Sequence, residues 1–234
     1  MKIGIIVAMD KEFAQLKTLL CNCRNEEKSG ARFLIGELNS SSQAMINATC
    51  ILHPCGIGKV NAAVGAAALI DYYHPDIIIS SGVAGGAQPS MQPLDIVAGT
   101  EYAYHDVYCG SEVAYGQFVG LPPRFTTPSQ LIEKARPLAT HCGLIVSGDW
   151  FVDSREKMTS ILNLFPSAVA VDMESCAIAH VCHLRGVPFI SFRIISDVPL
   201  NDHKAAQYFD FWDRMAEGSF NNLTHFIQSL CKTN

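Results

Sequence analysis

Three carboxylic acids stand just after apolar, strand-like runs of the sequence: Glu12, Glu174 and Asp197. In open α/β sheets, ligands bind at the carboxyl ends of the strands, so side chains in these positions can meet in one crevice. Two carboxyl groups in one crevice can divide the roles of general acid and general base. The positions of these residues therefore favour an acid–base site.

Each of these acids also has an ordinary structural explanation. Asp10 and Glu12 open a helical pattern, where carboxylates commonly cap the first turn and interact favourably with the helix dipole. Glu174 fits the first turn of another helix, and Asp197, close before Pro199, fits a turn or an N-cap. Taken singly, each residue is better explained by its structural role. The coincidence of all three at strand ends is what favours catalysis.

Two glycine-rich segments also follow strands, and neither matches a nucleotide-binding motif. Segment 56–59 lacks the Walker A pattern, because His53 stands where that motif needs glycine and Val60 where it needs serine or threonine. A tight strand-to-helix turn explains it better. Segment 82–86, Gly-Val-Ala-Gly-Gly, does not fit the dinucleotide-binding motif either. Its small residues would leave room for a substrate against the main chain.

Short apolar runs alternate with helical patterns along the whole chain, without a low-complexity linker or an internal repeat. Strands are expected at residues 2–8, 32–38, 44–53, 76–81, 95–104, 143–147, 168–171 and 188–195. Helices are expected at residues 11–20, 59–72, 130–140, 155–164, 175–185 and 204–230. The alternation is typical of layered α/β folds, and the wholly apolar run 77–79 suits a strand covered on both faces. We therefore expect one domain over residues 1–234, a three-layer α/β/α sandwich.

Composition excludes several classes of protein. A formal net charge of -5 leaves no basic excess to neutralise a phosphate backbone, so nucleic acid is not expected as a partner. The nine cysteines lack the spacing of a secreted disulfide framework, which favours the cytoplasm, and no paired spacing indicates a metal site. No apolar run reaches transmembrane length, and charges soon interrupt the N-terminal one, so neither a membrane span nor a signal peptide is expected. Only 17% of residues are charged, which indicates a buried subunit interface.

Eight segments carry a further resemblance: MKIGIIVAMDKE (1–12), GIGKVNAA (56–63), SGVAGG (81–86), YHD (104–106), YGQ (115–117), LIVSGDWFV (144–152), VDMESCAIAHVCH (171–183) and RIISDV (193–198). In order and spacing they resemble the bacterial 5'-methylthioadenosine/S-adenosylhomocysteine nucleosidases of the nucleoside phosphorylase superfamily, over almost the whole chain. The resemblance implies a nucleoside phosphorylase-like fold with a mixed, twisted sheet. It also implies hydrolysis of the N-glycosidic bond of a purine nucleoside, no metal or organic cofactor, and a homodimer.

Carried over residue by residue, the resemblance assigns Glu12 as the base that activates water and Asp197 as the acid that protonates purine N7. Ser196 would position Asp197, Glu174 would bind the ribose hydroxyls, and Met173 would pack beneath the sugar. An ordinary aspartic acid, with a pKa of about 3.9, is mostly ionised at neutral pH. Asp197 therefore needs burial or a hydrogen bond to keep its proton, whereas Glu12 must stay ionised.

The same resemblance assigns residues that would shape the pocket. The backbone at Phe151 and Val152 would bind the adenine edge, and the Phe151 ring would stack on the base. The apolar pocket for the 5'-substituent, to which the partner subunit contributes in this family, would be lined by Met9, Ile57 and Phe209. The strand end with small residues would add substrate contacts from Val83, Ala84 and Gly85.

Water is favoured over phosphate as the attacking group. Phosphorolytic relatives hold phosphate with arginines in two loops, but residues 8–12 here have carboxylates at their centre, and Ser80-Ser81-Gly82 has no arginine. A phosphate dianion would meet repulsion and no bidentate partner. A phosphate-dependent phosphorylase and a non-catalytic purine-nucleoside sensor remain as alternatives.

The sequence leaves the preferred 5'-substituent open. Val83 stands where relatives place serine or threonine, and segments 107–114 and 198–208 differ from the family pattern. The candidate substrates are methylthioadenosine, S-adenosylhomocysteine, 5'-deoxyadenosine and aminodeoxyfutalosine.

Overall fold

The computed structural model describes residues 1–39, 48–201, 211 and 221–231. Its strands are β1 (Lys2–Val7), β2 (Leu20–Lys28), β3 (Ala31–Leu38), β4 (Thr49–Pro54), β5 (Ile77–Gly86), β6 (Ile96–Tyr104), β7 (Phe125–Thr126), β8 (His141–Ser147), β9 (Ala168–Asp172) and β10 (Phe189–Asp197). Its helices are α1 (Asp10–Lys17), α2 (Lys59–Tyr73), α3 (Ser129–Ala135), the 3-10 helix η1 (Arg136–Leu138), α4 (Arg155–Leu164), α5 (Ser175–Arg185) and α7 (Asn221–Cys231).

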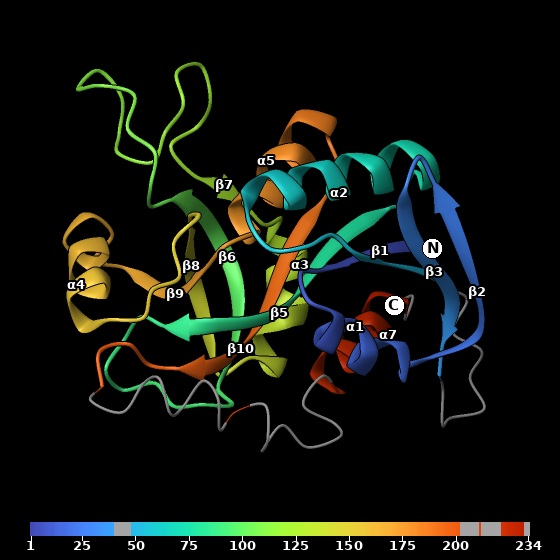
Figure 1. Cartoon of the computed structure of the whole chain (residues 1–234). Coiled ribbons are helices and arrows are strands. Elements are labelled where there is room, and N and C mark those ends of the chain that lie inside the picture. The colour runs from blue at the N-terminus through green and yellow to red at the C-terminus, as the bar shows by residue number, and fades with distance from the viewer. Residues whose placement is uncertain (40–47, 202–210, 212–220, 232–234) are drawn as a thin grey trace.

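The strands form one mixed sheet in the order β10-β6-β8-β9-β5-β1-β4-β3-β2, with β7 attached to β6. Because β10 pairs with β5 as well as with β6, the strands β5, β10, β6, β8 and β9 close into a ring (Figure 1). From this ring β1, β4, β3 and β2 extend as an open sheet. The alternation of elements in the sequence does not predict the closure.

Helices cover both faces of the sheet (Figure 1). α2 and α5 pack against each other on one side, α1 and α7 lie on the other, and Met158 and Ile161 of α4 pack into a third apolar cluster with residues of β8 and β9. The predicted α/β fold with a mixed sheet is therefore confirmed.

The wholly apolar start of β5 shows why this arrangement suits the sequence. Ile78 packs with Leu69 of α2, whereas Ile77 and Ile79 face the other side and join the cluster that contains Phe226 of α7. All three isoleucines are at most 1% exposed. Burying such a side chain contributes about 1.5–3 kcal/mol, so a strand without polar alternation is stable only between two helical layers.

The predicted bounds of α4 and α5 are right, and each helix has a residue at one end that marks where it starts or stops. α4 begins after Ser154, whose hydroxyl accepts the backbone N–H of Lys157 at 3.1 Å. α5 ends at Arg185 and is followed by Gly186, which adopts the left-handed conformation with φ of 66°. A hydroxyl N-cap and a glycine after the last turn are the usual helix ends.

Some predicted bounds are wrong. The first helix ends at Lys17 rather than at residue 20, because Leu20 begins β2, a polar edge strand that pairs only with β3 among the described residues. Neither β2 nor the short β7 is predicted from apolar patterning. Of the helix expected at 204–230, only Phe211 and residues 221–230 lie within the described residues, and 44–47 of an expected strand lie outside them.

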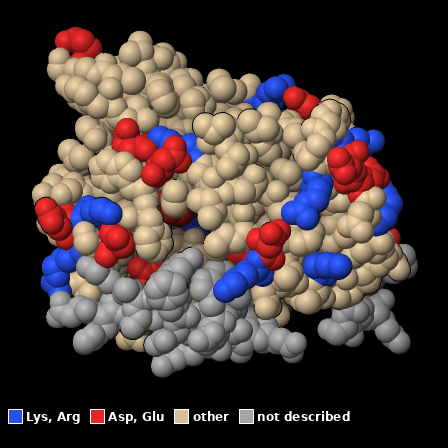
Figure 2. Space-filling view, in the orientation of Figure 1, with Lys and Arg blue, Asp and Glu red and all other residues tan. Residues whose placement is uncertain are grey.

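The described surface agrees with the composition. On the face in Figure 2, Lys and Arg side chains lie interspersed with Asp and Glu. Within the described ranges, no helix combines the length and apolar character needed to cross a bilayer.

Candidate active site

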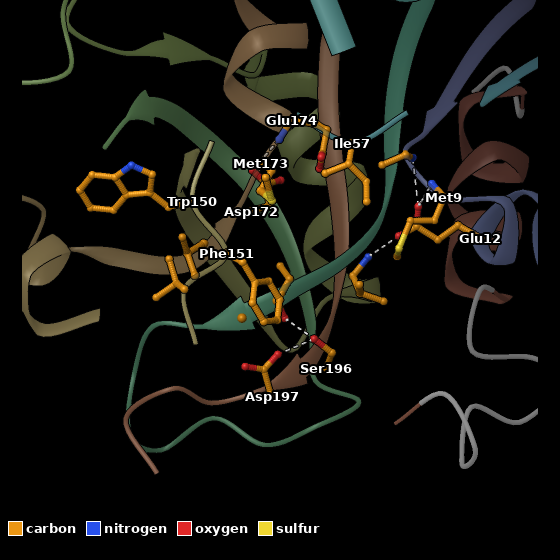
Figure 3. A pocket seen from close by; sticks show the side chains of 16 residues that line it. Met9, Glu12, Ile57, Trp150, Phe151, Asp172, Met173, Glu174, Ser196 and Asp197 are labelled. Carbon is orange, nitrogen blue, oxygen red and sulfur yellow. Dashed lines mark hydrogen bonds between the residues drawn. The ribbon is translucent and has the colours of Figure 1, made fainter. Parts of the chain in front are cut away.

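The carboxyl ends of β1, β5, β8, β9 and β10 meet at one pocket (Figure 3). The predicted site residues that line it are Met9, Glu12, Ile57, Val83, Ala84, Gly85, Phe151, Val152, Met173, Glu174, Ser196 and Asp197. Phe209, the remaining predicted residue, lies outside the described residues. Sequence reasoning did not name four other residues of the lining: Ala8, Trp150, Val171 and Asp172.

Glu12 is at once a helix cap and a pocket residue. One carboxylate oxygen accepts the backbone N–H groups of Ala8 at 3.0 Å and Met9 at 2.9 Å, at the start of α1, and the other accepts that of Val83 at 3.0 Å. The residue is 1% exposed. Burial raises the pKa of Glu12, and the charge of Arg193 and the three N–H groups oppose that rise. The structural and the catalytic interpretation of Glu12 are therefore compatible.

Asp197 ends β10 on the other side of the pocket (Figure 3). The register between β10 and β5 shifts between Ile195 and Asp197, and such an irregularity re-aims the side chain that follows it. The Ser196 hydroxyl donates to Asp197 Oδ1 at 2.6 Å and also lies 3.3 Å from the carbonyl oxygen of Ala84. Asp197 is 7% exposed. Ser196 therefore lies where it can orient the carboxyl group.

Glu174 lies at the N-terminal end of α5 and is buried. Its Oε1 accepts the backbone N–H of Gly58 at 2.9 Å. Burial, together with the nearby carboxylate of Asp172, raises the pKa of Glu174 to about 7. Gly56 and Gly58 have φ angles of 94° and 96°, so the tight strand-to-helix turn predicted for this segment is confirmed.

Arg193 is a buried cation beneath the pocket, and sequence reasoning missed it. Its Nε–H donates to Asp172 Oδ2 at 2.7 Å, and its Nη2 donates to the hydroxyls of Ser80 at 2.8 Å and Ser175 at 3.0 Å. The available signal was that Arg193 is the one charged residue in the mostly apolar predicted strand 188–195, because a buried arginine needs a charged partner nearby.

The small residues at the end of β5 leave room for these charged groups. A Cβ atom on Gly82 would lie only 2.6 Å from Glu12 Oε1, and it would also overlap Nη1 of Arg193. Nη1 of the guanidinium and the Glu12 carboxylate thus lie against the same stretch of main chain.

The pocket lining combines acidic and apolar groups. Glu12, Asp172, Glu174 and Asp197 bring four carboxyl groups, and no Lys, Arg or His is among the described residues that line it. Phe151 and Trp150 stand on one side of the opening (Figure 3), each about half exposed. The described residues contain no cluster of three or more His, Cys, Asp or Glu suited to a metal ion.

Comparison with known proteins identifies the family. Residues 2–228 match the phosphorylase superfamily. The 5'-methylthioadenosine/S-adenosylhomocysteine nucleosidase from Neisseria meningitidis, in complex with methylthio-immucillin-A, is 33% identical over 97% of this chain and 99% of its own, with a TM-score of 0.88. The S. pneumoniae nucleosidase with the transition-state inhibitor MT-ImmA is 31% identical over 98% and 100%, with a TM-score of 0.88. The nucleosidase from Colwellia psychrerythraea in complex with adenine is 30% identical over 98% and 96%, with a TM-score of 0.89. This chain therefore belongs to the phosphorylase superfamily and, within it, to the 5'-methylthioadenosine/S-adenosylhomocysteine nucleosidases.

Proposed function

We propose that this protein hydrolyses the N-glycosidic bond of 5'-substituted adenosines, such as methylthioadenosine and S-adenosylhomocysteine, to adenine and the free sugar. The observation that carries the proposal is the placement of Glu12 and Asp197 on different sides of one pocket, each with hydrogen bonds that fix its carboxyl group. Family members of similar size hold a methylthio-substituted inhibitor or adenine.

In this proposal Glu12 takes a proton from the attacking water. Its raised pKa makes it a better base than an ordinary glutamate, while the backbone N–H groups of Ala8, Met9 and Val83 favour the ionised form that the reaction needs. Arg193, beside the same stretch of β5, adds positive charge where hydroxide character develops.

Asp197 would deliver its proton to purine N7 as the base departs. The glycosidic bond breaks through an oxocarbenium-like state, so a positioned acid lowers the barrier by neutralising the leaving group. Glu174 would bind the ribose hydroxyls and Met173 would pack beneath the sugar. Phe151, Val152 and the exposed ring of Trp150 would form the base subsite.

Water fits this pocket better than phosphate does. The described lining has four carboxyl groups and no basic side chain, and the nearby Arg193 already donates to Asp172 at 2.7 Å. A phosphate dianion would therefore be repelled without gaining the bidentate contacts that arginine gives it.

We also propose that the protein is a homodimer. Val60 and Val64 lie one turn apart on α2 and are 73% and 64% exposed, and Tyr108 and Val119 of segment 105–124 are similarly exposed. A second copy of the chain would cover these apolar side chains and would complete the 5'-substituent pocket beside Met9 and Ile57. Light scattering would then give twice the chain mass of 25.5 kDa.

All nine cysteines are free thiols, which suits the reducing cytoplasm. There the reaction would break down 5'-substituted adenosines, and so would serve nucleoside catabolism and methionine salvage.

Product analysis tests the proposed reaction. Purified protein is incubated with methylthioadenosine in phosphate-free buffer and again with added phosphate, followed by S-adenosylhomocysteine, 5'-deoxyadenosine and aminodeoxyfutalosine. Free adenine and methylthioribose without phosphate are expected. A sugar 1-phosphate formed only with phosphate would identify a phosphorylase, and binding without cleavage of all four nucleosides would identify a sensor.

A further inference from the structure

Two neighbouring backbone amides at the start of α2 hold acidic side chains from two different segments. The N–H of Gly58 donates to Glu174 Oε1 at 2.9 Å, and the N–H of Lys59 donates to Asp149 Oδ1 at 2.8 Å. Such amides have no partner within the helix and lie at the positive end of its dipole. One helix end therefore fixes both the carboxylate of Glu174 and the segment 148–153.

The side chain of Lys59 completes this arrangement. Its Nζ lies 2.6 Å from Asp106 Oδ2 and 3.7 Å from Asp149 Oδ2. The same oxygen of Asp106 accepts the backbone N–H of Asp149 at 2.9 Å. Nζ also lies over the ring of Tyr104, 5.6 Å from its centroid. Two aspartates from separate parts of the chain are thus bound to one largely buried ammonium group.

Lys59, Asp106 and Asp149 do not line the pocket themselves, but Asp149 is followed directly by Trp150 and Phe151, which do. About half of each of these aromatic residues is exposed. Packing covers them only in part: the centroid of the Trp150 ring lies 5.4 Å from that of His105, and Lys157 Nζ lies 3.4 Å from the Phe151 carbonyl oxygen. The anchoring of the preceding Asp149 therefore adds to what fixes the direction in which the two rings project.

We propose that Lys59, Asp106 and Asp149 form a positioning network, which holds the base-stacking segment 148–153 in register with the sugar-binding Glu174. The inference rests on the proposed function, in which Phe151 stacks on adenine. Without the ammonium group, the carboxylates of Asp106, whose side chain is 9% exposed, and Asp149, whose side chain is 48% exposed, would face each other with like charges. Segment 148–153 would then shift, and a displacement of about 1 Å at such a distance from the chemistry can cost about a hundredfold in rate.

Adenine is the probe, because it occupies the base subsite without needing turnover. Its Kd is measured by isothermal titration calorimetry for the wild type, Lys59→Met, Lys59→Arg and the control Arg185→Met. The control removes the ion pair, at 2.9 Å, between Arg185 of α5 and Asp71 of α2. Asp71 lies at the opposite end of α2 from Lys59. We expect Lys59→Met to weaken adenine binding by about tenfold or more. Lys59→Arg should recover most of that loss, and Arg185→Met should bind like the wild type.

The titration separates positioning from folding. A merely structural role for Lys59 would lower the number of sites filled per chain while leaving the Kd of the folded fraction unchanged, and that result would overturn the network. An unchanged Kd with full stoichiometry in Lys59→Met would overturn it as well. If the wild type binds adenine but cleaves no nucleoside, only the proposed reaction fails. The adenine Kd values of the variants then still test whether the network positions segment 148–153. If the wild type does neither, the proposed function fails and the inference with it.

Discussion

The Nε–H of Arg193 donates to Asp172 Oδ2 at 2.7 Å, and the two side chains are only 2% and 1% exposed. Glu174 Oε2 lies 4.0 Å from the same guanidinium group, and the charge of Arg193 also acts on Glu12. Removing one partner of a buried ion pair leaves the other charge without compensation. Arg193 is therefore the countercharge for a group of carboxylates that would otherwise repel one another.

Arg193→Met should destabilise the fold by about 3–5 kcal/mol, because three buried carboxylates lose their countercharge. Urea denaturation at pH 7 measures the change. Arg24→Met is the matched control, since Arg24 pairs with Glu26 at 3.0 Å but its side chain is 65% exposed, and it should change the stability far less than Arg193→Met does. Equal losses in the two variants would contradict the assigned role of Arg193.

Asp197→Asn should lower kcat by about 10²–10⁴-fold while leaving nucleoside binding measurable, because the amide keeps the size of the side chain but cannot deliver the proton. Steady-state kinetics with methylthioadenosine, together with calorimetric binding, would check this. The exposed Asp71 provides a control through Asp71→Asn, which should turn over normally. Near-wild-type activity of Asp197→Asn would rule out its role as the acid.

Glu174→Gln should change the pH dependence of stability. The pKa of Glu174 is raised from 4.5 to about 7, so the folded protein holds this proton more tightly than the unfolded chain does. The stabilising contribution of the group is present below about pH 4.5 and is lost as the pH rises through 7. The neutral variant should therefore be more stable than the wild type at pH 8, by about 2 kcal/mol, with little difference at pH 5. Urea denaturation at both pH values tests this, and a variant less stable at pH 8 would refute it.

Gly82→Ala should reduce kcat/KM by about a hundredfold, because its methyl group would displace Glu12 or Arg193 from the main chain of β5. Gly30→Ala is the control: its methyl group meets no atom within 4 Å, and the strain of an alanine at the positive φ of 79° stays in the turn between β2 and β3, outside the pocket, so kcat/KM should be unchanged. Activity of Gly82→Ala within threefold of the wild type would show that the close approach of Glu12 to β5 is not needed.

Val64→Glu should dissociate the proposed dimer, since it places a charge in the centre of the apolar surface of α2. Light scattering is expected to show the mass of a single chain, together with a higher KM for methylthioadenosine. Lys17→Glu, on the exposed end of α1, changes the charge elsewhere and should leave the mass unaltered. A Val64→Glu protein that stays at twice the chain mass would place the interface on another surface.

The strand-end rule predicted that Glu12, Glu174 and Asp197 would share one crevice, because it depends only on where apolar runs stop. Arg193 was not predicted, because a single charged residue within an apolar strand does not change the periodic pattern from which the strand is identified. Its partners come from elsewhere in the chain, so sequence spacing does not identify them.

The missed parts of the fold have similar physical causes. β2 is a polar edge strand whose side chains are mostly exposed, so it has no apolar pattern to detect. The pairing of β5 with β10 joins residues more than a hundred positions apart. Local propensity contains no information on which strands will pair over such a distance.

The pairing of β5 with β10 has one more consequence. Val83 on β5 donates to Glu12, and Asp197 on β10 pairs in register with Gly85 of β5. The separation of Glu12 and Asp197, the proposed base and acid, is thus tied to the spacing of adjacent, hydrogen-bonded strands. Segment 105–124 belongs to no strand, and its length and composition can vary without disturbing that spacing. In the proposed dimer, changes in this segment can therefore reshape the 5'-substituent pocket while the strands that carry the proposed acid and base keep their spacing.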